Sequence, residues 1–130
     1  MINILIRAES RYPISRNTIK EVVEKVLIEK KVKGKLELSI NIVGDRFMRA
    51  MNRKYRNLDN TTDVLAFPLS ETRKDTFFVD PPDDVLRLGD VMISYPQAVV
   101  DASEEEKMVD QKVAELVEHG LLHLLGYHHE

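Results

Sequence analysis

Apolar and polar residues alternate most regularly over residues 36–43. The segment reads Leu36-Glu37-Leu38-Ser39-Ile40-Asn41-Ile42-Val43. A period of two places successive side chains on opposite faces, which predicts a half-buried strand. Residues 2–6 and 88–93 predict two further strands, and residues 62–67 predict a fourth that Pro68 closes.

Three other segments, residues 15–34, 45–56 and 103–125, have apolar residues at helical spacing. Ser103 and Glu106 form a capping box, which predicts the start of the third helix, and Gly126 predicts its end. Residues 70–87 are predicted to form an irregular loop. The inner stripe of the second helix is predicted to be Phe47, Met48, Met51 and Tyr55. We therefore expect one α+β domain over residues 1–130, a small mixed sheet packed with helices, with the C-terminal helix central.

Composition narrows the class of protein. The chain has 130 residues, of which 43% are hydrophobic and 32% charged, as expected for one folded domain. No apolar run approaches the roughly 20 residues that cross a bilayer, and the start of the chain lacks the features of a signal peptide. The chain has no cysteine, which excludes disulfides, thiolate zinc sites and a cysteine nucleophile. We expect a cytoplasmic protein.

The charge is divided unevenly along the chain. Residues 1–60 hold 14 lysines and arginines and 7 acidic residues, whereas residues 61–130 hold 5 and 15. Such a division indicates a surface for a polyanion such as nucleic acid, unless the charges intermix in the folded molecule. Four arginines share one face of the second predicted helix: Arg46, Arg49, Arg53 and Arg56.

All four histidines lie in the last twelve residues. His119 and His123 are four residues apart on one helical face, so their rings can meet at one ion. Gly126 can reverse the chain and bring His128 or His129 back toward them. This is the spacing of three-histidine zinc sites of the metzincin type, in which the fourth position is open to water. Both helical histidines stand among leucines, where an unpaired imidazole is costly to bury.

The metal and the reaction have alternatives. Zinc suits imidazole best, although nickel, copper or iron could occupy three nitrogens. Metalloproteases place a glutamate directly after the first histidine as general base, and here that residue is Gly120. Glu118 points about 100° away around the helix. The usual proteolytic machinery is therefore missing.

Four motifs together resemble one known family. The segment from His119 to His129, with Gly120, His123, Gly126 and Tyr127, is similar to the signature of the YbeY family, bacterial endoribonucleases that mature ribosomal RNA. The runs 51–56, 59–68 and 88–91 resemble three further stretches of that family. They read Met-Asn-Arg-Lys-Tyr-Arg, Asp-x-x-Thr-Asp-Val-Leu-Ala-Phe-Pro and Leu-Gly-Asp-Val. The resemblance spans roughly the whole chain.

The resemblance implies one zinc ion on His119, His123 and His129, and a site arginine at Arg56. It implies a zinc-dependent, single-strand-specific endoribonuclease of ribosomal RNA processing, including 16S 3′-end maturation, with RNA and the ribosome or a ribosomal protein as partners. His128 departs from the family, which usually has aspartate there, and His128 is an alternative ligand.

If the resemblance holds, Arg56 would clamp a phosphate as a planar bidentate donor. Arg46, Arg49 and Arg53 would follow the RNA backbone. Residue patterns leave the general base open among four groups: Asp63, Asp90, Glu118 and His128. Two other functions remain alternatives, a zinc hydrolase of peptides or amides and a non-catalytic, zinc-stabilised ribosome assembly factor.

Overall fold

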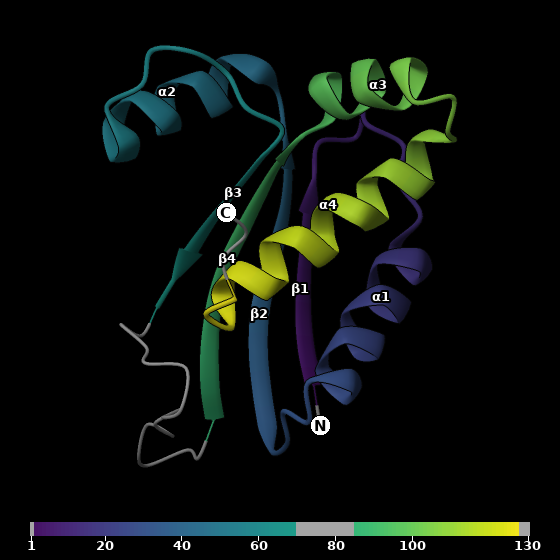
Figure 1. Cartoon of the computed structure of the whole chain (residues 1–130), viewed down its shortest axis with the longest axis vertical. Coiled ribbons are helices and arrows are strands. Elements are labelled where there is room, and N and C mark those ends of the chain that lie inside the picture. The colour runs from purple at the N-terminus through teal and green to yellow at the C-terminus, as the bar shows by residue number, and fades with distance from the viewer. Residues whose placement is uncertain (1, 70–84, 128–130) are drawn as a thin grey trace.

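The chain folds into one mixed sheet with helices on it, shown as a computed structural model in Figure 1, which describes residues 2–69 and 85–127. The strands and helices alternate over most of the chain. In order they are β1 (Ile2–Ala8), α1 (Arg16–Glu29), β2 (Lys35–Val43), α2 (Asp45–Arg56), β3 (Val64–Pro68), β4 (Val85–Ser94), α3 (Tyr95–Glu104) and α4 (Val109–Leu124). None of the described helices is both long and apolar enough to span a membrane.

The strand order in the sheet is β1-β2-β4-β3. β1 pairs with β2 and β2 pairs with β4, both parallel, whereas β3 runs antiparallel to β4 at the margin. The parallel pairs need crossover connections, which α1 supplies between β1 and β2. The expected mixed sheet is therefore confirmed.

One face of the sheet carries the apolar core. Leu36, Leu38, Ile40 and Ile42 of β2 are all buried, as their alternation predicts. α4 lies across this face and contacts β3, β4, α1 and α3 (Figure 1). The central position of the C-terminal helix is confirmed.

The last helix begins later than the sequence predicts, at Val109 rather than at Ser103. Ser103 does not cap it but lies in the last turn of α3, a helix that the apolar pattern did not predict. α3 begins instead after Ser94, whose hydroxyl accepts a hydrogen bond from the Gln97 backbone N–H at 3.2 Å. α4 begins at Val109 after Met108, without a side-chain cap. Glu106 has a positive φ of 56° and lies between the two helices.

Two other sequence predictions also differ from the structure. β4 begins at Val85, so the predicted loop ends earlier than residue 87, and its remainder, residues 70–84, lies outside the described residues. In α2, Met48 is buried, but the predicted inner residues Phe47 and Tyr55 are exposed. The buried residues of α2 are Met48 and Asn52, whereas the exposed Tyr55 ring contacts Phe67 of β3 edge to face.

Candidate functional site

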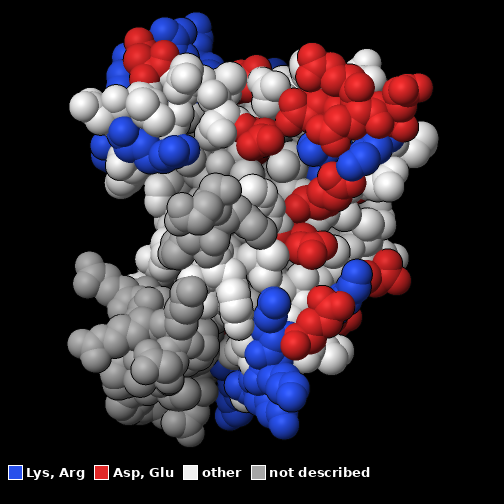
Figure 2. All heavy atoms as spheres, viewed as in Figure 1, with Lys and Arg blue, Asp and Glu red and all other residues white. Residues whose placement is uncertain are grey.

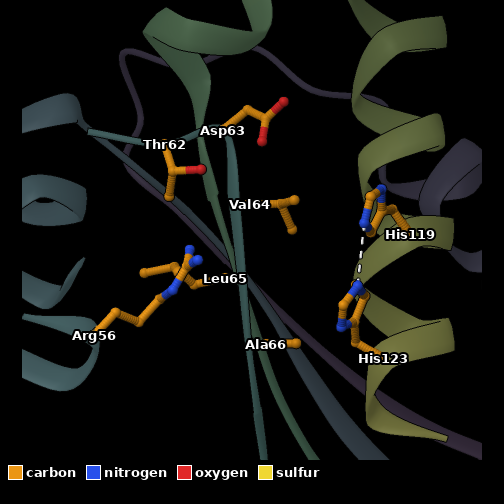
Figure 3. Close-up of a pocket in the computed structure, with 9 residues that line it drawn as sticks. Arg56, Thr62, Asp63, Val64, Leu65, Ala66, His119 and His123 are labelled. Carbon is orange, nitrogen blue, oxygen red and sulfur yellow. Dashed lines mark hydrogen bonds between the residues drawn. The ribbon is translucent and has the colours of Figure 1, made fainter. Parts of the chain in front are cut away.

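Two histidines of α4 converge on one point. The Nε2 atoms of His119 and His123 lie 3.2 Å apart, and their rings are stacked at 5.0 Å with an angle of 8° between planes (Figure 3). Two nitrogens bound to one tetrahedral zinc at about 2.0–2.1 Å are separated by about 3.3 Å. The pair is therefore spaced as two ligands of one such ion would be.

The helix ends as the glycine predicts. Gly126 has a φ of 90°, and its N–H donates to the carbonyl of His123 at 3.0 Å. The N–H of Tyr127 donates to the carbonyl of Leu122 at 2.9 Å, which completes a Schellman motif. The chain turns back just beyond the histidine pair. His128 and His129, the two candidates for the third ligand, lie outside the described residues.

Gly120 explains the missing glutamate. A Cβ atom at this position would lie 2.5 Å from Cγ1 of Val91 and 3.3 Å from Cγ2 of Val64. The glycine faces the sheet, and α4 approaches β3 and β4 too closely for any side chain there. The position that holds the general base in metalloproteases is therefore closed to glutamate by packing.

The histidine pair borders a cavity of about 480 Å³ between α4, β3 and the end of α2. Arg56 extends into it from the side opposite the histidines, and β3 passes between them (Figure 3). The expectation that both histidines are buried among leucines is wrong, because His119 is exposed and His123 is half-buried. The helix turns their neighbouring leucines 121 and 124 into the core and the rings toward the cavity.

Among the described residues that line the cavity, Asp63 is the one with a carboxyl group. It lies beside Thr62, just before β3. Burial raises the pKa of Asp63, and a hydrogen bond and charge repulsion from Asp101 raise it further. Asp101 belongs to α3 and also accepts from the Gln97 side chain at 3.2 Å. Sequence reasoning missed Asp101 because it missed the helix that carries it.

The other candidate bases lie elsewhere. Asp90 is on the opposite face of the sheet, where it accepts a hydrogen bond from Ser39. Glu118 is not among the residues that line the histidine cavity. Of the four candidates, the structure thus brings Asp63 alone, within the described residues, to the cavity.

The four arginines of α2 do not act as one set. Arg49 donates to both carboxylate oxygens of Asp59, from Nε at 3.0 Å and from Nη2 at 3.3 Å, and Arg53 lies 3.8 Å from the same carboxylate. The hydrogen bond from Arg49 holds the pKa of Asp59 below its usual value. Arg46 and Arg49 line a second hollow, whereas Arg56 faces the histidine cavity.

A mixed sheet crossed by a helix with paired histidines, facing an arginine across a cavity, defines an α+β protein with a histidine-centred cleft. The family model described as Endoribonuclease YbeY matches residues 5–130. The chain belongs to the YbeY family.

Individual relatives agree with this assignment. An Endoribonuclease YbeY of Dehalococcoides mccartyi is 38% identical, over 99% of this chain and 78% of the relative. One of Roseiflexus sp. is 42% identical over 86% of this chain and 69% of its own. The solution structure of TM1509 from Thermotoga maritima superposes with a TM-score of 0.59 at 27% identity, over 98% of this chain and 75% of that one.

Proposed function

We propose that this chain is a zinc-dependent, single-strand-specific endoribonuclease of ribosomal RNA processing, including 3′-end maturation of 16S rRNA, in the cytoplasm. The carrying observation is the convergence of the His119 and His123 Nε2 atoms, 3.2 Å apart, in a cavity that Arg56 enters from the other side. Membership of a family described as an endoribonuclease supports RNA as the substrate.

The donor set fits a metal ion. Two imidazole nitrogens at the separation of a shared ligand sphere suit zinc, and His129 completes the set in the proposal. His128 is the alternative third ligand. When bound, the metal supplies Lewis-acid chemistry at a phosphodiester and lowers the pKa of a coordinated water.

Arg56 orients the RNA. Its guanidinium is a planar donor on the cavity wall opposite the histidines, where it holds a phosphate by two parallel hydrogen bonds and stabilises charge that develops on it. Arg49 and Arg53 already contact Asp59, so they bind the RNA phosphate backbone more weakly than Arg46 and Arg56 do.

In this proposal Asp63 is the general base. Its raised pKa, caused by burial and by Asp101, makes it a better proton acceptor than an ordinary aspartate. Asp101 is a positioning residue, because it acts on the cavity through Asp63.

The structure favours RNA cleavage over peptide hydrolysis. Packing of Gly120 against Val91 leaves the proteolytic glutamate position without a side chain. A purely structural zinc site would have little use for a cavity of about 480 Å³ beside the histidines, with an arginine and a carboxyl group on its walls. Ribosomal partners remain part of the proposal.

Two variants test the function. His123→Ala should lose most bound zinc, measured by elemental analysis of the purified protein, and with it RNA cleavage. Arg56→Ala should keep its zinc but cleave a single-stranded RNA about 100-fold more slowly, because a positioned charge on the reacting phosphate is lost. Full zinc content in His123→Ala would refute the ligand assignment.

Two controls sharpen the result. Arg11→Ala removes a guanidinium from an exposed position paired with Glu9, and it should cleave at the normal rate. Casein should remain intact under conditions in which RNA is cut. Cleavage of casein without cleavage of RNA, or an Arg56→Ala rate equal to that of the parent, would contradict the proposal.

A further inference from the structure

The second face of the sheet carries a polar surface that the histidine site does not use. Strand pairing places Ser39 beside Asp90, and Asp90 in turn beside Phe67 of β3. The next row on this face joins Arg7 of β1, Asn41 of β2 and Met92 of β4. These side chains alternate with the buried core residues, so they project away from α1 and α4.

α2 turns part of this face into a hollow. Met51 and Tyr55 of α2 close one side of a cavity of about 350 Å³, and Phe67, Asn41 and Asp90 line it from the sheet. The volume lies within the range of pockets that hold small ligands. The Tyr55 and Phe67 rings meet edge to face at 5.2 Å, and Tyr55 is 55% exposed. Lys54 Nζ lies over the Tyr55 ring, 5.2 Å from its centroid, and the exposed part of the ring offers a surface for stacking.

The polar groups of the hollow are held in place. The Asn41 amide donates to Ser39 Oγ at 2.9 Å and to the Val91 carbonyl at 3.3 Å, and the Ser39 hydroxyl donates to Asp90 Oδ1. Within the described residues, these bonds use neither Asn41 Oδ1 nor Asp90 Oδ2. Two acceptor oxygens on a fixed framework therefore remain for a ligand that donates hydrogen bonds.

Arg7 gives this hollow a cation. It is exposed, and no ion pair joins it to any residue in ranges 2–69 and 85–127. Tyr55 of the hollow and Arg56 of the histidine cavity are adjacent in α2, and both cavities border the marginal strand β3. A single nucleic-acid strand around this margin can reach both.

We propose that the hollow formed by Tyr55, Phe67, Asn41 and Asp90 binds one nucleobase of the RNA strand, selecting a base with an amino group, while Arg7 contacts a phosphate. The ring stacks on Tyr55, and the amino group donates to the acceptor oxygens of Asn41 and Asp90. Cytosine, with an amino group at C4, binds better than uracil, which has a carbonyl there. The inference rests on the proposed RNA substrate but concerns binding rather than cleavage.

Binding to fluorescent ten-residue oligocytidylate and oligouridylate tests this, in chelator-containing buffer so that cleavage does not interfere. Oligocytidylate should bind about fivefold more tightly. Tyr55→Ala should weaken oligocytidylate binding about tenfold, and Tyr55→Phe should bind normally because it keeps the stacking ring. Asp90→Asn should reduce the preference for cytosine. Arg7→Ala should lower the salt dependence of binding by about one phosphate contact.

Lys20→Ala is the matched control for Arg7→Ala, since it removes an exposed positive charge from α1, which packs on the other face. The side-chain amide signal of Asn41 in an NMR spectrum should shift on addition of cytidine monophosphate. An unshifted Asn41 signal, equal affinity for the two oligonucleotides, or unchanged binding by Tyr55→Ala would overturn the nucleobase site.

The two proposals fail separately. If the protein prefers oligocytidylate to oligouridylate as expected but never cleaves RNA, the nuclease proposal is overturned and the base site stands. Normal cleavage by a protein whose Tyr55→Ala variant binds as well as the parent would overturn the base site alone. A peptide that shifts Asn41 when no nucleotide does would also count against the base site.

Discussion

At the scale of single residues, Gly120 sets the distance between α4 and the sheet. The helix can bring its histidines to the cavity rim because the residue between them has no side chain to separate it from Val91. A glycine inside a helix costs about 1 kcal/mol in helix propensity, so its presence here has a packing reason. The same contact decides which catalytic chemistry the helix can carry.

Gly120→Ala should destabilise the protein by about 1–3 kcal/mol, because the new methyl group would overlap Val91 by more than helix propensity repays. Urea unfolding measures the change. The matched test is Gly120→Ala in a Val91→Ala background, where the smaller neighbour leaves room. There the alanine should be neutral or stabilising. Equal losses in both backgrounds would mean that Val91 is not the obstacle.

At the scale of elements, local signals predicted those whose cause is local. The alternation of residues 36–43 follows from the burial of one face of β2. Gly126 marks the turn with positive φ that ends α4. α3 escaped prediction because its buried residues are two alanines, Ala98 and Ala102, which make no apolar stripe. The Ser103 capping box does not form, because Ser103 belongs to the last turn of α3, which packs against α4.

The cleft itself could be predicted only in part. Spacing along α4 was enough to pair His119 with His123, since one helix holds both. The placement of Arg56 on the cavity wall opposite that pair depends on the order of strands, which no local pattern contains. A site role for Arg56 was expected only from the family resemblance. The Asp63–Asp101 contact depends on α3 and was not expected at all.

Ser94→Ala should lower stability by about 1–2 kcal/mol, since Ser94 both caps α3 and donates to Asp45. Ser103→Ala is the internal control. It removes the same hydroxyl from the end of the same helix, and we expect a change within about 0.5 kcal/mol. Thermal unfolding of the two variants decides. A larger loss for Ser103→Ala would restore the capping box and contradict the assigned start of α4.

At the scale of the whole molecule, the two halves of the chain remain electrically distinct. Figure 2 shows acidic side chains gathered over α3 and the start of α4, and basic side chains on α2 and beyond the end of α1. Ion pairs of Lys107 and Lys112 with Glu105 and Glu115 balance only part of the acidic end. Charges of opposite sign meet in these ion pairs and in the pairs of Arg49 and Arg53 with Asp59, but basic side chains are concentrated on α2 and acidic ones over α3 and the start of α4 (Figure 2). A polyanion would therefore approach from the α2 side.

The Asp63–Asp101 pair predicts how stability varies with pH. Because folding raises the pKa of Asp63, the folded state binds its proton more tightly than the unfolded state. Stability should fall as pH rises from the ordinary aspartate pKa of 3.8 through the raised value, and the loss is complete above it. Asp101→Asn removes the repulsion and should raise the melting temperature at neutral pH.

The control is Asp110→Asn, which removes a carboxylate from the exposed start of α4. It should not stabilise the protein, because the negative charge there is favourable near a helix N-terminus. Melting temperatures from pH 4 to pH 8 would compare the variants. If Asp101→Asn melted below the parent throughout, the two carboxyl groups would not oppose each other.

The position of β3 has a consequence for the behaviour of the molecule at high concentration. This strand spans five residues at the margin of the described sheet, and Pro68 at its end has no N–H to offer (Figure 1). A margin so short and proline-terminated gives a second copy little backbone to pair with. We therefore expect this margin, which borders the cleft, to resist edge-to-edge aggregation with a second copy.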